Sequence, residues 1–184
     1  MVALVIAGAM SFTACTKKVD EKTMAEINQF GTDWTALGEK ATNWSNELSA
    51  TATQAKEFAT KQTEMAGMMA TSKDAALKAK TAEAANVATQ DAAKLEGMQT
   101  EWSTFKATWD ETTAQFSEWK DKLLKGQVTP EDATKGLADF KTKMSDAQAK
   151  VDSWSTNYAE VKTSCEKNMA MAAELGKPAD VVKK

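Results

Sequence analysis

Sulfur-containing side chains are the residues of this sequence whose type and spacing could support chemistry. Three methionines lie within residues 65–69, and Met169 and Met171 follow Cys165 within about two helical turns. Thioether and thiol groups are the ligands that Cu(I) and Ag(I) prefer. If the fold brings these two segments together, they predict a soft-metal site. Its candidate ligands are Met68, Met169, Met171 and Cys165.

The same side chains also have an interpretation as packing residues. Met65 and Met69 fall on the apolar stripe of their segment, and methionine commonly fills irregular gaps in a core. A nucleophilic cysteine needs a neighbouring base such as histidine, and the sequence contains no histidine. Core packing is therefore favoured for Cys165 and for the methionines, with Cu(I) or Ag(I) binding as the alternative.

The charged residues argue against two further function classes. The 184 residues include 26 acidic and 23 basic ones, the net charge is -3, and every basic residue is lysine. Proteins that read nucleic acid need a basic surface and favour arginine for bidentate contacts. Without histidine or arginine, the sequence also lacks the commonest general base and the usual anion clamp. We expect neither nucleic-acid binding nor catalysis, and no cofactor.

An apolar stripe within residues 95–124 indicates the fold that must position the sulfur-containing side chains. Its members recur at steps of three and four residues, with one doubled step at Thr112, so they line one face of a long helix. A single helix cannot bury such a stripe, so other helices of matching length must cover it. The stripe consists of Leu95, Met98, Trp102, Phe105, Trp109, Phe116, Trp119 and Leu123.

Two further segments have the required length and period. Apolar residues keep a heptad phase through residues 20–70, interrupted by Thr51 and Gln62, and again through residues 130–175. No segment shows the alternating pattern of a strand. The sequence therefore predicts an all-α fold, an elongated antiparallel three-helix bundle with up-down-up order and coiled-coil-like packing over residues 20–176. The helices should span about residues 20–70, 73–125 and 130–175, each roughly 70 Å long.

The turns between these helices differ in how clearly the sequence marks them. Gly126 suits a left-handed helix C-terminus, and Thr129 followed by Pro130 suits the start of the next helix. Thr71 or Ser72 is the candidate N-cap at the first turn. Gly31 and Gly38 lie inside the first segment, but because the apolar phase continues through both, we expect one helix weakened there.

The tryptophans occupy stripe positions in all three segments, so core packing is favoured over a ligand cage. Counting from the turns places Trp34 beside Trp109, and Trp44 near Trp102 and Trp154. The full set is Trp34, Trp44, Trp102, Trp109, Trp119 and Trp154.

The N-terminus carries a short apolar run at residues 2–10, followed by Phe12-Thr13-Ala14-Cys15. The run is too short to span a bilayer and suits the hydrophobic part of an export signal. This stretch resembles the lipobox of bacterial lipoprotein precursors. The resemblance implies a signal peptide at residues 1–14, acylation of Cys15, and a lipidated tether at residues 15–19. A plain cleavable signal that ends near Ala14 is the alternative, and residues 177–184 are predicted to form a polar tail.

The resemblance also implies a location and limits the function classes. In Gram-negative lipoproteins an aspartate directly after the acylated cysteine favours the inner membrane, and Thr16 stands there instead, so the outer membrane facing the periplasm is favoured. We expect a lipid-anchored envelope protein that acts without catalysis as a structural or protein-interaction module, with an envelope protein as partner. A methionine-based Cu(I) or Ag(I) lipoprotein is one alternative. A helical bundle that opens to bind lipid is another.

Overall fold

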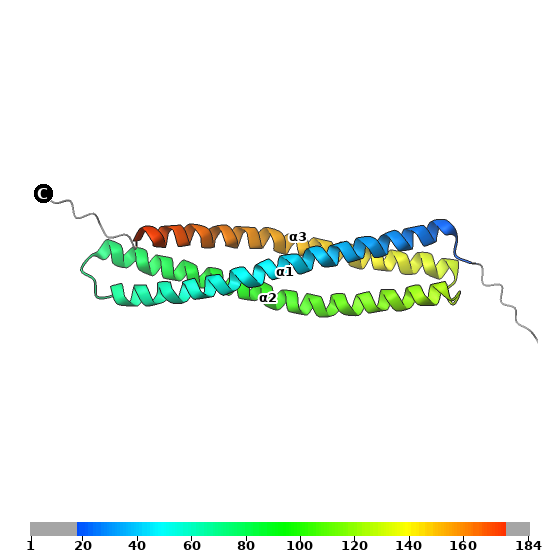
Figure 1. The fold of residues 1–184 in the computed structure, drawn as a ribbon, viewed down its shortest axis with the longest axis horizontal. Helices are drawn as coiled ribbons and strands as arrows, with labels where there is room; N and C mark the ends of the chain where they lie inside the picture. The colour runs from blue at the N-terminus through cyan, green and yellow to red at the C-terminus, as the bar shows by residue number, and fades with distance from the viewer. Residues whose placement is uncertain (1–17, 176–184) are drawn as a thin grey trace, which may run out of the picture.

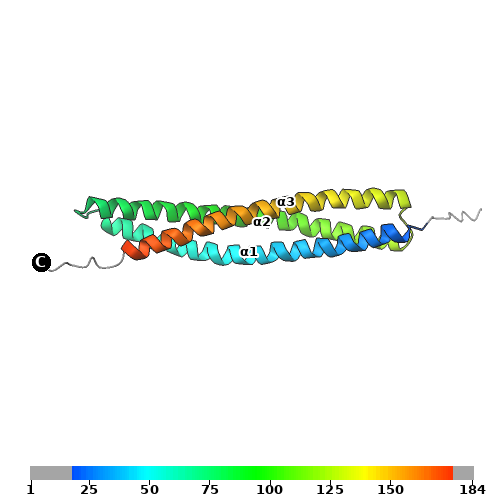
Figure 2. The same cartoon turned by 90° about the horizontal axis from the view of Figure 1, so that it is seen from above.

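The computed structural model describes residues 18–175, which form three long helices packed side by side as a rod (Figure 1). Helix α1 spans Glu21–Met69, α2 spans Ala75–Leu124, and α3 spans Pro130–Leu175. The three helices run up, down and up, and a view turned by 90° shows the same rod (Figure 2). The predicted fold class is confirmed, and each predicted helix boundary lies within two residues of the observed one. We call the end where α1 begins proximal, and the end where α1 finishes distal.

The helices begin at side chains that satisfy their first backbone N–H groups. Asp20 caps α1, because its carboxylate accepts the Thr23 N–H at 2.9 Å, and this bond is the largest cause that lowers the pKa of Asp20. Asp74 caps α2 by accepting the N–H groups of Ala76 and Leu77, both at 3.0 Å. The expected cap at Thr71 or Ser72 was therefore wrong. The Ser72 hydroxyl instead accepts the N–H of Asp74 at 3.2 Å, which supports the residue that caps the helix.

The second turn agrees with its prediction. Gly126 has a φ of 69°, the left-handed conformation that a glycine adopts without a steric penalty. The Thr129 hydroxyl accepts the Asp132 N–H at 3.1 Å and donates to the Asp132 carboxylate at 2.7 Å. Pro130 is the first residue of α3, where its missing N–H costs no hydrogen bond. This turn thus stops α2 and restarts the chain in the opposite direction.

The core changes in character along the rod. The proximal third is built of large rings and aliphatic side chains from all three helices, including Phe30, Phe116 and Phe140. The distal third buries mostly alanines, among them Ala59, Ala84 and Ala88, together with four polar residues. Helix α1 is continuous through Gly31 and Gly38, as the unbroken apolar phase predicted.

Two helical glycines make room for tryptophans on neighbouring helices. A Cβ atom at Gly38 would lie 3.2 Å from the Trp109 ring, and one at Gly136 would lie 2.7 Å from Trp119 Nε1. Contacts shorter than 3.0 Å require one of the two groups to move. At these positions the absence of a side chain therefore permits close packing, although glycine weakens the helix locally.

Alanine substitutions at two glycines should have opposite effects. We expect Gly136→Ala to lower the free energy of unfolding by about 1–3 kcal/mol, because the new methyl group overpacks against Trp119. Gly97→Ala is the matched control: a methyl group there would meet nothing within 4 Å, so helix propensity alone should raise stability by about 0.5–1 kcal/mol. Urea unfolding followed by circular dichroism measures both. Equal changes in the two variants would contradict the close packing at Gly136.

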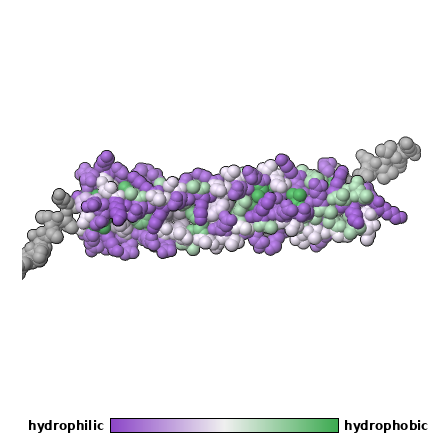
Figure 3. Space-filling model, turned by 180° about the vertical axis from the view of Figure 1, so that it is seen from behind, coloured by the Kyte–Doolittle hydropathy of each residue, from purple (hydrophilic) through white to green (hydrophobic). Residues whose placement is uncertain are grey.

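The visible surface of the rod is mainly hydrophilic, and apolar side chains form small separate patches on it (Figure 3). The large hydrophobic residues exposed within residues 18–175 are Met68, Leu124 and Met171. None of the three helices has the length of uncharged apolar sequence needed to cross a membrane.

Candidate functional site

The four candidate soft-metal ligands lie toward the distal end, as predicted, but in different environments. Met68 and Met171 are 67% and 40% exposed, whereas Cys165 is buried and Met169 is half-buried against the neighbouring core. Residues 18–175 contain no group of three or more histidine, cysteine or acidic side chains that could hold a metal. Binding of Cu(I) or Ag(I) by the methionines stays a prediction.

Cys165 is a poor nucleophile in this environment. Burial, followed by the negative charge of Asp91 and a hydrogen bond to that carboxylate, raises the pKa of the thiol to about 11. A raised pKa keeps the group as the unreactive thiol at neutral pH. The position therefore agrees with the interpretation of Cys165 as a packing residue.

This raised pKa predicts a specific alkaline instability. Below the ordinary value of 9.0 the thiol is protonated in both folded and unfolded chains, and its contribution to stability is complete. Between pH 9 and about 11 the unfolded chain loses the proton first, so the free energy of unfolding should fall with rising pH, by about 2–3 kcal/mol in total. Urea unfolding at pH 8 and pH 11 should show this extra loss in the wild type and not in Cys165→Ala. Parallel pH profiles would contradict the buried thiol, because the two proteins differ only at residue 165.

The distal core also buries four polar residues that sequence reasoning did not recognise as a group. Gln62, Thr81, Asp91 and Asn168 are each less than 5% exposed. Asn168 Nδ2 donates to the Ala84 carbonyl at 2.9 Å, and the Thr81 hydroxyl donates to carbonyls of its own helix. One oxygen each of Gln62, Asp91 and Asn168 has no hydrogen-bond partner. The signal was present as polar residues at positions where the heptad pattern requires apolar ones.

The six tryptophans divide into two groups. Trp34, Trp44 and Trp154 are buried, whereas Trp102, Trp109 and Trp119, all on α2, are only half-buried. The predicted neighbours are correct: the rings of Trp34 and Trp109 stack at 3.8 Å, and Trp44 lies 5.9 Å from Trp102 and 5.4 Å from Trp154. Grooves run along both sides of α2, and Trp109 lines both of them while Trp102 lines one.

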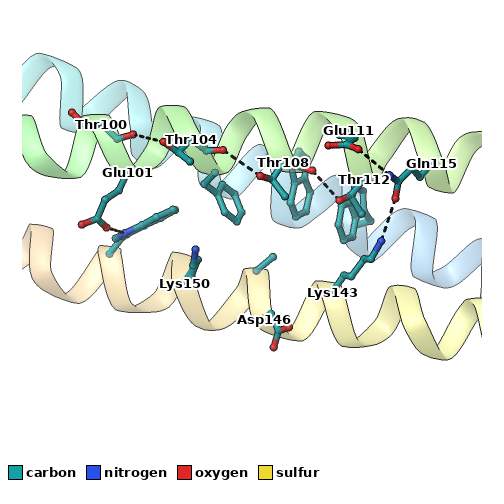
Figure 4. A pocket seen from close by; sticks show the side chains of 15 residues that line it. Thr100, Glu101, Thr104, Thr108, Glu111, Thr112, Gln115, Lys143, Asp146 and Lys150 are labelled. Carbon is teal, nitrogen blue, oxygen red and sulfur yellow. Dashed lines mark hydrogen bonds between the residues drawn. The ribbon is translucent and has the colours of Figure 1, made fainter.

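A groove in the middle of the rod lies between α2 and α3, and its volume is about 660 Å³ (Figure 4). Aromatic side chains from all three helices form its floor, namely Trp34, Phe105, Trp109 and Trp154. Small and polar residues form the walls. No single residue pattern in the sequence predicted this groove, because it depends on the spacing between two helices.

A row of threonines explains why the groove stays open on the α2 side. Thr100, Thr104, Thr108 and Thr112 follow one another at every fourth residue, and each hydroxyl donates to the carbonyl four residues earlier (Figure 4). These short side chains fold back onto their own helix, and such bonds tend to bend it. Ala147 on α3 is also too small to fill the space. A larger apolar residue at these positions would fill the space between α2 and α3 and close the groove.

Two lysines and three acidic residues line the groove, and both lysines stand on its α3 wall. Lys143 and Lys150 point toward α2, whereas Asp146 points away from it (Figure 4). Lys143 donates to the uncharged Gln115 Oε1 at 3.2 Å, and Lys150 forms no ion pair with any described residue. The Glu101 carboxylate on α2 accepts the indole N–H of Trp154 at 2.7 Å. The site can therefore offer an apolar floor and two ammonium groups to a ligand.

Several predictions concern residues at the two ends of the chain that the structure does not describe. Cys15, the signal peptide at residues 1–14 and the polar tail at 177–184 lie outside residues 18–175. Comparisons of this chain with family models, with curated proteins and with solved structures find no match.

Proposed function

We propose that this protein is a lipid-anchored component of the bacterial cell envelope that works without catalysis, as a structural or protein-interaction module. The acyl anchor is on Cys15, the location is the outer membrane facing the periplasm, and the partner is another envelope protein. The alternatives of methionine-based metal binding and of a bundle that opens on lipid remain predictions.

The position where the bundle begins is the observation that supports this proposal best. Asp20 caps α1 only five residues after Cys15, so the tether is short and leads directly into the proximal end of the rod. Helix α1 has 49 residues, which corresponds to about 70 Å. A lipid at Cys15 would hold one end of the rod at the membrane and present its other end roughly that far away. Such an arrangement suits a spacer or a platform for binding.

Lipid labelling tests the anchor directly. Cells that express the full chain are grown with an alkyne analogue of palmitate, and we expect the label on the wild type and none on Cys15→Ser. Cys165→Ser is the matched control, because the second cysteine lies in the core of the bundle and should leave labelling unchanged. Fractionation should show the wild type with outer membranes and Cys15→Ser in the soluble fraction. An unlabelled wild type would refute the proposal.

The interaction role needs a second measurement. Cross-linking in intact cells with a photoreactive residue at exposed Met68, near the distal turn, should yield a specific adduct with another envelope protein. A photoreactive residue at exposed Lys135, in the proximal half of α3, is the comparison position. Absence of any adduct from either position would contradict the interaction role while leaving the anchor in place.

A further inference from the structure

We propose that the groove between α2 and α3 binds a free long-chain fatty acid, with the acyl chain on the aromatic floor and the carboxylate at Lys143 and Lys150. This inference goes beyond the proposed function, since it requires no acyl group on Cys15. It assigns a ligand class to the cavity lined by Trp34, Phe105, Trp109 and Trp154.

The dimensions of the groove fit one extended chain. Its α2 wall runs from Thr100 to Gln115, which is about 22 Å at the rise of an α-helix. One leaflet of a bilayer has about 15 Å of hydrocarbon, the length of a single acyl chain. The volume of about 660 Å³ lies within the range of small-molecule sites. A helix, with a diameter of about 10 Å, would need a much wider opening.

The lining of the groove suits a thin apolar ligand. Trp34 and Trp154 are only 4% and 5% exposed, so the floor offers small areas of ring, and Phe105 and Trp109 are half-buried beside them. The threonine hydroxyls donate to backbone carbonyls, which leaves their methyl groups as an apolar part of the wall. An acyl chain gains binding free energy when its whole length leaves water, and it needs no hydrogen bonds from the floor.

Although the lining holds two lysines and three acidic residues, the positions of the two lysines on the α3 wall suit an anionic head group. Lys143 contacts only an uncharged amide oxygen and the ring of Phe140, and Lys150 has no carboxylate partner among the described residues. Of the acidic residues in the lining, Glu101 accepts from Trp154, Glu111 accepts from Gln115 at 3.2 Å, and Asp146 points away (Figure 4). Two ammonium groups two helical turns apart can therefore meet a carboxylate at this wall.

Titration with lauric acid tests the proposal. The full chain carrying Cys15→Ser, freed of co-purified lipid, is titrated below the micelle concentration and followed by tryptophan fluorescence and calorimetry. We expect one saturable equivalent of laurate. Methyl laurate and dodecyltrimethylammonium should bind about tenfold more weakly, because they cannot make the charge-assisted contact. Since the anchor is absent from this variant, the outcome is independent of the proposed function.

Two pairs of variants locate the binding site. Thr108→Phe should abolish laurate binding by filling the groove, whereas Thr142→Phe, an exposed threonine with the same backbone bond outside the groove, should not. Lys143→Gln with Lys150→Gln should weaken laurate binding about tenfold and leave methyl laurate unchanged, while Lys135→Gln should change neither. Failure of laurate to bind, or binding that survives Thr108→Phe, would overturn the proposal. Dimerisation that Thr108→Phe abolishes, without laurate binding, would assign the groove to a second copy of the chain instead.

Discussion

Replacing Trp154 by alanine is expected to lower the free energy of unfolding by about 3–5 kcal/mol, a large share of the stability of an ordinary domain. The Trp154 ring stacks against Trp44 with centroids 5.4 Å apart and lies perpendicular to the Phe105 ring with centroids 5.1 Å apart. Its N–H donates to the Glu101 carboxylate at 2.7 Å. Truncation removes the ring contacts, leaves a cavity at the junction of all three helices, and deprives Glu101 of its donor.

Urea unfolding of the full chain, followed by circular dichroism, measures this loss. Trp154→Phe separates the two contributions, because it keeps an aromatic ring and removes the hydrogen bond to Glu101. We expect the phenylalanine variant to lose less than half as much stability as the alanine variant. A loss below about 1 kcal/mol in Trp154→Ala would show that the ring does not organise the core, since buried truncations of this size cost several times more.

Replacing Asp91 by leucine is expected to raise the free energy of unfolding by about 1–4 kcal/mol. Asp91 is 2% exposed, has no lysine partner among the described residues, and leaves one carboxylate oxygen without a hydrogen bond. The hydrogen bond with the Cys165 thiol compensates the burial of this carboxylate only weakly, whereas an apolar side chain of similar size needs no hydrogen-bond partner. The gain should appear as a higher urea midpoint.

Asp139→Leu is the control for this prediction, because Asp139 is an exposed aspartate on α3. It should change stability by no more than about 0.5 kcal/mol, as surface substitutions usually do. If Asp91→Leu instead lowers stability, the Asp91 carboxylate must be held more strongly than by the Cys165 thiol alone, for example by an ordered water molecule.

The fold could be predicted because its determinants are local and periodic. The steps of three and four residues place apolar side chains on one face of each helix, whatever the exact partner. Gly126 can take the left-handed conformation that other residues avoid, and Pro130 has a fixed φ that suits the first turn of a helix, so the second turn was predictable to the residue. The first turn has no such residue. Its true cap, Asp74, competes in sequence with Thr71 and Ser72, which have similar capping ability.

The groove and the buried polar residues could not be predicted in the same way, because both depend on distances between helices. A threonine at every fourth position of α2 was visible, but threonine is equally common on a solvated face. Similarly, Asp91 and Asn168 interrupt the apolar phase, and only packing decides whether such an interruption faces water or the core. The half-burial of Trp109 likewise depends on the distances between helices. The sequence pattern therefore identifies which face of a helix is apolar, but it does not determine how deeply each residue on that face is buried.

The odd number of helices has a mechanical consequence. Because the chain runs up, down and up, Glu21 and Leu175 lie at opposite ends of the rod (Figure 1). Tension applied between these ends would slide α1 and α3 lengthwise along their neighbours, in shear, so that every layer of the core resists at once. A hairpin of two helices, pulled from adjacent ends, would instead peel apart one layer at a time. If a lipid holds one end and a partner the other, as we propose, this protein would carry load in its stiffer direction.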